Sequence, residues 1–127
     1  MGVLNTLRRL GPIKKGSHDY GDFFEHFIFT ELKAYIDYFH PIKRLFYWRS
    51  TSGFEVDFLI ENKVAIEVKS SDNISDKHLK GLLALKEENL IEEYILISDE
   101  KTRRKVKGIL IYPWREFLDE LWAGKII

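Results

Sequence analysis

The sequence predicts a mixed α/β domain, a central mixed sheet of four to five strands flanked by helices in the order α-β-β-β-α-β-β-α. Three observations predict this fold class. Residues 20–39 have helical periodicity, two alternating runs are joined by three residues, and short apolar runs lie among later helical segments. A length of 127 residues suggests one domain. We expect a lead-in over residues 1–18, with a short helical turn around 3–10, and the domain over residues 19–127.

The first helix is expected from Tyr20 to Phe39, because His40-Pro41 ends the periodic segment. At 100° per residue, one broad face is apolar and consists of Phe24, Ile28, Leu32, Tyr35, Ile36 and Phe39. Glu25 falls inside this face, where an unpaired charge is costly to bury. Glu25 is therefore a candidate functional residue, with a helix N-terminal acid favoured by the dipole as the alternative.

Three strands follow, at residues 43–50, 54–60 and 64–70. The second run alternates, and we expect its apolar side chains Val56 and Phe58 on one face and Asp57 on the other. The third run likewise separates its valines and Ile66 from Glu67 and Lys69. A hairpin through residues 61–63 would place Ile60 opposite Val64, and continuing that register predicts two charged pairs, Asp57 with Glu67 and Glu55 with Lys69.

Opposed carboxylates repel each other, so this pairing favours a bound cation. Asp57 and Glu67 would supply oxygen ligands to Mg²⁺ or Mn²⁺. Lys69 could orient or deprotonate a metal-bound water, and Glu25 could approach from the first helix. The alternative is a solvated strand face with weak ion pairs.

The remaining chain predicts a helix over residues 76–88 capped by Ser75, a strand over 92–98, a charged loop over 99–105, a strand over 107–112, and a last helix starting at Pro113. The four histidines show no metal-ligand spacing, so each is expected on the surface.

Charge and composition restrict the function classes. Lys plus Arg and Asp plus Glu are both 20, so nucleic-acid binding would need a local patch. The candidate phosphate contacts are Lys77, Lys80, Arg103 and Arg104, with a solvated loop as the alternative for the last two. The absence of cysteine excludes disulfides and thiol catalysis and fits a location in the cytoplasm. No apolar run reaches the length of about 18 residues that a membrane span needs, so we expect none.

Three stretches resemble the PD-(D/E)xK nuclease-like superfamily: Gly53-Phe54-Glu55-Val56-Asp57-Phe58, Ala65-Ile66-Glu67-Val68-Lys69-Ser70-Ser71, and Gly21-Asp22-Phe23-Phe24-Glu25. More narrowly, the run from Tyr20 to about Leu83, including residues 45–49, resembles a domain of unknown function at the C-terminus of prokaryotic AAA-type ATPases. Val3-Leu4-Asn5 resembles the sequence just ahead of that domain.

The resemblance implies a restriction-endonuclease-like core and magnesium-dependent phosphodiester hydrolysis of DNA or RNA, of which we expect DNA. It implies Asp57, Glu67 and the Val68 carbonyl as metal ligands, Lys69 as the catalytic lysine, and Glu25 as support for the metal or its water. No GxxxxGK[ST] loop is present, so this chain has no ATP site.

The alternative is that the chain is catalytically inactive. It would then be a module left from an ATPase-associated protein, and it would bind nucleic acid or a protein. A surface left without the ATPase part could pair with itself, which gives a homodimer as a further expectation.

Overall fold

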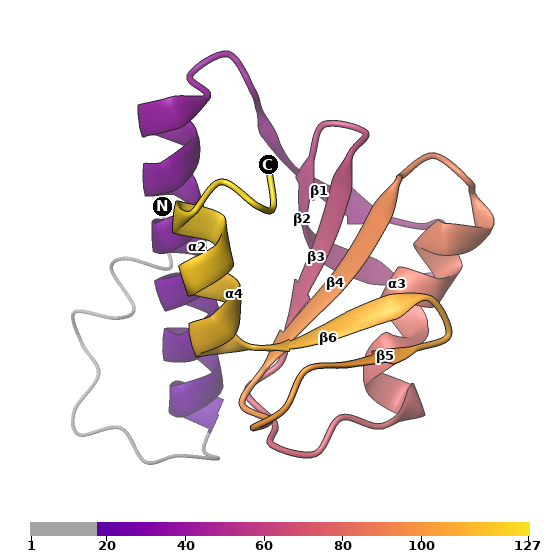
Figure 1. Ribbon diagram of the computed structural model, residues 1–127. Helices are drawn as coiled ribbons and strands as arrows, with labels where there is room; N and C mark the ends of the chain where they lie inside the picture. Colours follow the sequence, from indigo (N-terminus) through magenta and orange to yellow (C-terminus); the bar gives the residue numbers. More distant parts are fainter. Residues whose placement is uncertain (1–17) are drawn as a thin grey trace.

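A six-stranded mixed sheet with strand order β1-β2-β3-β4-β6-β5 forms the centre of the domain in the computed structural model, which describes residues 18–127 (Figure 1). Strands β1 to β3 are antiparallel, β3, β4 and β6 are parallel, and β5 is antiparallel to β6. The elements in chain order are α2 His18–Phe39, β1 Leu45–Arg49, β2 Glu55–Ile60, β3 Val64–Val68, α3 Asp76–Glu87, β4 Glu93–Ser98, β5 Arg104–Val106, β6 Ile109–Pro113 and α4 Trp114–Trp122. The predicted α/β fold class is confirmed.

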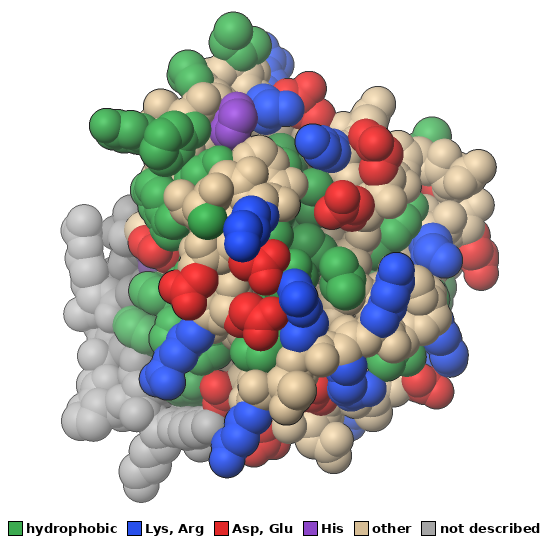
Figure 2. All heavy atoms as spheres, viewed as in Figure 1, with side chains coloured by type: hydrophobic (Ala, Val, Ile, Leu, Met, Phe, Trp, Pro, Cys, Tyr) green, Lys and Arg blue, Asp and Glu red, His purple; other side chains and the backbone are tan. Residues whose placement is uncertain are grey.

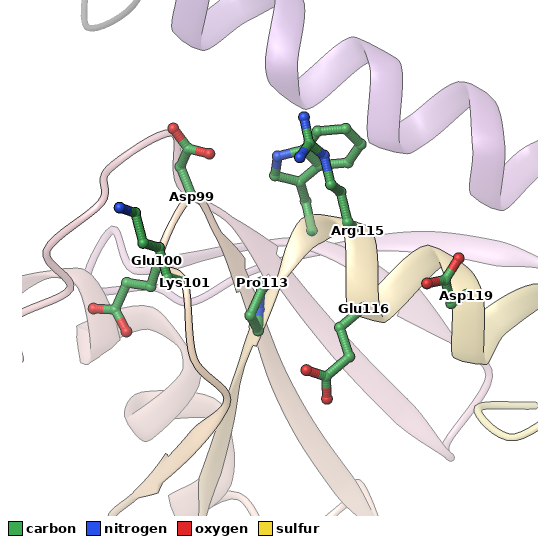
Figure 3. Close-up of a pocket in the computed structure, with 8 residues that line it drawn as sticks. Asp99, Glu100, Lys101, Pro113, Arg115, Glu116 and Asp119 are labelled. Atoms are coloured by element: carbon green, nitrogen blue, oxygen red, sulfur yellow. The ribbon is translucent and has the colours of Figure 1, made fainter.

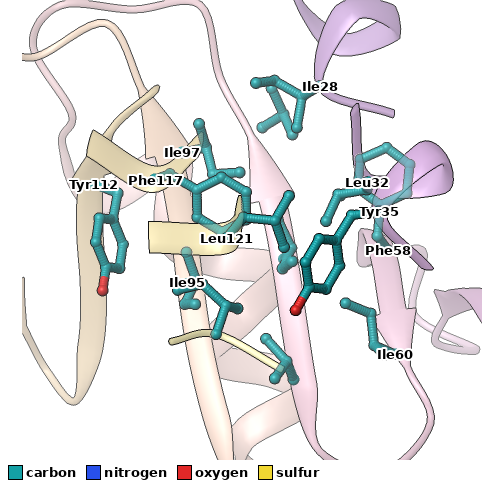
Figure 4. Close-up of a cluster of buried hydrophobic side chains, with 14 of the residues drawn as sticks. Ile28, Leu32, Tyr35, Phe58, Ile60, Ile95, Ile97, Tyr112, Phe117 and Leu121 are labelled. Carbon is teal, nitrogen blue, oxygen red and sulfur yellow. The ribbon is translucent and has the colours of Figure 1, made fainter. Parts of the chain in front are cut away.

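Helices cover both faces of this sheet. α2 and α4 pack on one face and α3 on the other (Figure 1). The larger core lies under α2 and α4 and joins them to the sheet through Ile28, Leu32, Tyr35, Phe58, Ile60, Ile95, Ile97, Phe117 and Leu121 (Figure 4). The two cores fix the positions of β2 and β3, the strands that carry the candidate site.

One strand lies where the sequence predicted a loop. Residues 104–106 form β5, so the sheet has six strands and not four or five. Charged side chains fill this short strand and hide its periodicity. A two-residue turn joins it to β6, and Lys107 (φ 53°) and Gly108 (φ 83°) both lie in the left-handed region. Such turns match the twist of a hairpin, so Lys107-Gly108 was the available signal.

The expectations for the first helix hold with two changes. α2 begins at His18, and the rest of the predicted lead-in lies outside the described residues. His26 was expected on the surface, but it is buried, with 9% of its side chain exposed. Its ring lies beside the Phe29 ring at 6.2 Å, and the Thr30 hydroxyl approaches Nε2 at 3.4 Å. The surface prediction was wrong because aromatic neighbours on the same helix cover the imidazole.

Strand β2 carries an extra residue near its middle. Phe46 of β1 lies opposite Leu59, whereas Trp48 lies opposite Val56, so β2 advances three residues while β1 advances two. A bulge of this kind resets the alternation of side chains. Val56 therefore packs in the core under α3, while Phe58 packs in the core under α2 and α4. The prediction that these two side chains share a face was wrong for this reason.

No helix within residues 18–127 is long and apolar enough to cross a membrane.

Candidate functional site

The antiparallel ladder between β2 and β3 opens at the residues predicted to be functional. The structure confirms the predicted pairs up to Phe58 opposite Ile66, and the ladder recorded between these strands ends there. Beyond this point Asp57 Oδ2 accepts a hydrogen bond from the Val68 backbone N–H at 2.9 Å. A side chain from the bulged stretch of β2 thus takes the place of a backbone acceptor at this point. The expected regular pairing of Asp57 with Glu67 and of Glu55 with Lys69 is not among these ladder pairs.

The carboxyl groups of Asp57 and Glu67 nevertheless meet. Glu67 is buried, with 5% of its surface exposed, and its carboxyl lies within hydrogen-bonding reach of that of Asp57. Burial raises the pKa of Glu67 far above its usual range, and hydrogen bonding to Asp57 and the negative charge of Asp57 raise it further. Two carboxylates this close cannot both ionise cheaply. At neutral pH the pair therefore holds a proton.

Two further predicted residues lie around this pair. The positive charge of Lys69 offsets part of the rise in the pKa values of Glu67 and Glu25, so its ammonium acts on both carboxyls. Glu25 projects from α2 and keeps much of its side chain in solvent. Its pKa is raised to about 7 by partial burial and then by the charge of Asp57. The four residues predicted from sequence are therefore brought together from α2, β2 and the end of β3.

Helix α3 borders the pair on the other side. Gly81 approaches the sheet so closely that an added Cβ would lie 2.1 Å from the Glu55 carbonyl oxygen and 3.3 Å from Glu67 Oε2. The helix begins after Ser75, as predicted, and the Ser75 N–H donates to His78 Nδ1 at 3.0 Å. Burial lowers the pKa of His78, and the charges of Lys77 and Lys69 lower it further. Sequence reasoning missed Gly81, since only the helix–sheet contact shows why a glycine is needed there.

The donor set at this site suits a hard divalent cation. Asp57 and Glu67 offer carboxylate oxygens within reach of each other, and magnesium completes its shell with water when only one or two carboxylates bind it. Within residues 18–127, no group of three acidic or histidine side chains is arranged to hold a metal ion. A cation here would need waters, a backbone carbonyl such as that of Val68, or substrate oxygens.

A comparison with protein families identifies the chain. A family model described as a domain of unknown function, DUF4143, matches residues 20–117. The chain belongs to the DUF4143 family. No curated protein and no solved structure matches it. The DUF4143 match includes Glu25, Asp57, Glu67 and Lys69, and the relation to the PD-(D/E)xK superfamily stays a prediction.

The predicted phosphate contacts of this DUF4143 domain fall into two groups. Lys77 and Lys80 are exposed on α3. Arg103 contacts Glu116 at 3.0 Å and Glu120 at 2.9 Å. Arg104 contacts Glu100 at 2.9 Å and donates to the Ile74 carbonyl at 2.8 Å, which ties the β4–β5 loop to the start of α3. Phosphate would have to compete with these carboxylates, so the two arginines have a structural role in the described domain.

A separate pocket of about 490 Å³ lies at the carboxyl ends of β4 and β6 (Figure 3). Its charged lining is predominantly acidic and consists of Asp99, Glu100, Glu116 and Asp119 with Lys101 and Arg115. The guanidinium of Arg115 lies over the Trp114 ring at 4.9 Å. An acidic lining disfavours a polyanion, so this pocket is not a suitable path for DNA.

Proposed function

We propose that this domain is a metal-dependent phosphodiesterase acting on DNA, with its active centre at the Asp57–Glu67 pair. The observation that carries the proposal is the placement of the buried Glu67 carboxyl beside Asp57, whose own carboxylate is held at the end of β3 by the Val68 N–H at 2.9 Å, close to Lys69. Two carboxyl groups held together at the end of the sheet ladder lower the stability of the fold. Binding of a cation would offset this cost, which is typical of a functional site.

Each residue has a role in this proposal. Asp57 and Glu67 would hold the cation, with the Val68 carbonyl as a third ligand. The bound Mg²⁺ or Mn²⁺ would supply charge stabilisation and lower the pKa of a coordinated water. Lys69 would orient that water toward the scissile phosphate. Glu25, whose pKa of about 7 suits proton transfer near neutral pH, would accept or pass on its proton.

The test is DNA cleavage by the purified chain with labelled single-stranded, duplex and branched substrates in Mg²⁺ or Mn²⁺. We expect cleavage that Asp57→Ala and Lys69→Ala each abolish. Glu92→Gln is a matched control, because Glu92 is an exposed carboxylate ahead of β4 and away from the site. Cleavage that persists equally in Asp57→Ala and Lys69→Ala would overturn the mechanism and indicate a contaminant.

A second candidate function is a non-catalytic binding module. The composition of the carboxyl pair favours this second function. Within residues 18–127, no third acidic or histidine side chain completes a metal-binding group with Asp57 and Glu67. In that case wild-type protein would leave every substrate intact in both metals, and binding assays would still detect a nucleic-acid or protein partner.

A further inference from the structure

The open side of the candidate site is bordered by Tyr47. This residue lies between the pairs Phe46–Leu59 and Trp48–Val56, so it faces the bulged stretch of β2 that carries Asp57. β1 is the first strand of the sheet, and no described strand pairs with its outer edge. Tyr47 is accordingly 57% exposed. An aromatic ring thus lies in solvent on the Asp57 side of the site, while Glu67 reaches Asp57 from the α3 side.

Arg49 lies beside Tyr47 on the same face. Leu45 packs against the core under α2 and α4 and Trp48 against the core under α3, so strand alternation places Tyr47 and Arg49 on the α2 face. The Glu55 carboxylate raises the pKa of the nearby Tyr47 hydroxyl, and Arg49 Nε lies 3.6 Å from Glu55 Oε1. The arginine contact is long and both of its partners are exposed, so it is weak and easily exchanged.

We propose that Tyr47 and Arg49 form the surface on which an unpaired nucleotide of single-stranded DNA lies beside Asp57. This deepens the proposed function and rests on it for the choice of nucleic acid. A tyrosine ring can stack on any base, and an arginine can contact the adjoining phosphate. Bases inside a duplex are already stacked on each other, so a single exposed ring favours a strand that is already unpaired.

The charges around this surface set a condition on binding. Carboxyl groups of Glu25, Glu55 and Asp57 lie close by and repel phosphate, whereas Lys69 and Arg49 attract it. A divalent cation at the carboxyl pair would reverse much of that repulsion. Binding of single-stranded DNA should therefore be tighter with a divalent cation than with a chelator.

The experiment measures fluorescence anisotropy of a labelled single-stranded oligonucleotide with the full chain, in calcium and in EDTA. We expect Tyr47→Ala to weaken binding about 5- to 100-fold, the effect of losing one stacked base, while Tyr47→Phe keeps it within about twofold. Arg49→Ala should reduce the dependence of log affinity on log salt by about 0.7, the value for one phosphate contact on a single strand.

Phe46→Ala is the matched control. Phe46 is the preceding residue of the same edge strand and is 49% exposed, but strand alternation directs it to the other face. It should leave the affinity within about twofold of wild type. Circular dichroism would establish that each variant is folded, and the salt slope of Arg49→Ala provides a reading that does not depend on Tyr47→Ala folding.

Three outcomes would each overturn the inference. Phe46→Ala and Tyr47→Ala could lose DNA affinity equally, Tyr47→Ala could keep the wild-type affinity, or the wild type could fail to bind. Binding that depends on Tyr47 without any cleavage would support the inference and remove the proposed catalysis. Cleavage with no dependence on Tyr47 would support the proposed catalysis and remove the inference. Binding and cleavage are measured separately, so the two failures are distinguishable.

Discussion

Glu67 illustrates at the scale of one residue how a fold can keep a carboxyl group neutral. Its side chain is almost fully buried and its nearest polar partner is another carboxyl group, that of Asp57. Neither condition favours the charged form, and together they raise the pKa of Glu67 far above its usual value. A cation that binds both oxygens must first displace the shared proton.

Cation affinity should consequently rise with pH. Below the raised pKa of Glu67 each bound cation releases a proton, so Mn²⁺ affinity should increase by at most about tenfold per pH unit from pH 6 to 8. Titration calorimetry of the wild-type chain would measure it. Glu67→Gln should bind weakly with no such slope, and a flat wild-type affinity would contradict the shared proton.

Stability should show the opposite pH dependence in metal-free buffer. The folded state retains a proton on Glu67 that the unfolded chain releases above its usual pKa of 4.5. Stability from this group is therefore complete below that value and is lost as pH rises toward the folded pKa. Glu25 adds to the loss only up to about pH 7.

Urea denaturation between about pH 7 and 9 isolates the Glu67 contribution. We expect the wild type to lose at most about 1.4 kcal/mol per pH unit in this range and Glu67→Gln to lose less. Identical slopes for the two proteins would show that Glu67 is already ionised at neutral pH.

Sequence reasoning brought Asp57, Glu67 and Glu25 together but predicted neither their geometry nor their electrostatics. The hairpin register directed Asp57 toward Glu67, whereas the bulge that lets the two carboxyls meet left no sign in the sequence. The protonation of Glu67 depends on burial, and that burial depends on how α3, the next element of the chain, packs against the sheet. Tyr47 was missed because its exposure depends on β1 being an edge strand.

At the scale of elements, α3 and β2 are held in contact by a glycine. The Gly81 Cα approaches the Glu55 carbonyl, where no flexible side chain can move aside to accept a Cβ. Gly21 of α2 also faces the site, but an added Cβ there would meet only Ser70 Oγ at an ordinary 3.4 Å. These two helical glycines form a natural comparison.

Gly81→Ala should lower the free energy of unfolding by about 1–3 kcal/mol, because overpacking at the backbone exceeds the gain in helix propensity. Gly21→Ala should be neutral or stabilise by up to about 1 kcal/mol. Chemical denaturation of both variants measures the difference. If Gly81→Ala were as stable as Gly21→Ala, α3 would have to lie further from the sheet than it does here.

Element order and type were largely predictable, whereas local irregularities were not. Periodicity indicated every helix within residues 18–127 and the strands that bury a face. β5 buries little, so its three residues left no apolar pattern. The sequence from Val56 to Phe58 alternates as in a regular strand, yet the bulge places the two side chains in different cores. Only the pairing with β1 reveals the bulge.

At the scale of the whole molecule, exposed apolar side chains gather near the carboxyl end of α2, where Figure 2 shows hydrophobic groups around a histidine. Tyr38, Phe39, Ile42 and Trp122 are all exposed there, and the Phe39 and Trp122 rings lie 6.1 Å apart. This surface is where the predicted homodimer would form.

Light scattering of the purified chain at several concentrations would test the homodimer. We expect a dimer mass that returns to the monomer in Ile42→Glu, since Ile42 is 92% exposed and the change should leave the fold intact. A monomer at every concentration would contradict the prediction.

The pairing of Arg103 with Glu116 and Glu120, and of Arg104 with Glu100, has a kinetic consequence. These two paired arginines contribute little long-range field, and the chain as a whole carries no net charge. A polyanion would then meet this domain at an unsteered encounter rate of about 10⁵–10⁶ M⁻¹ s⁻¹ rather than the higher rates of basic binders. Rapid recruitment to DNA would have to come from a tether or partner that raises the local concentration.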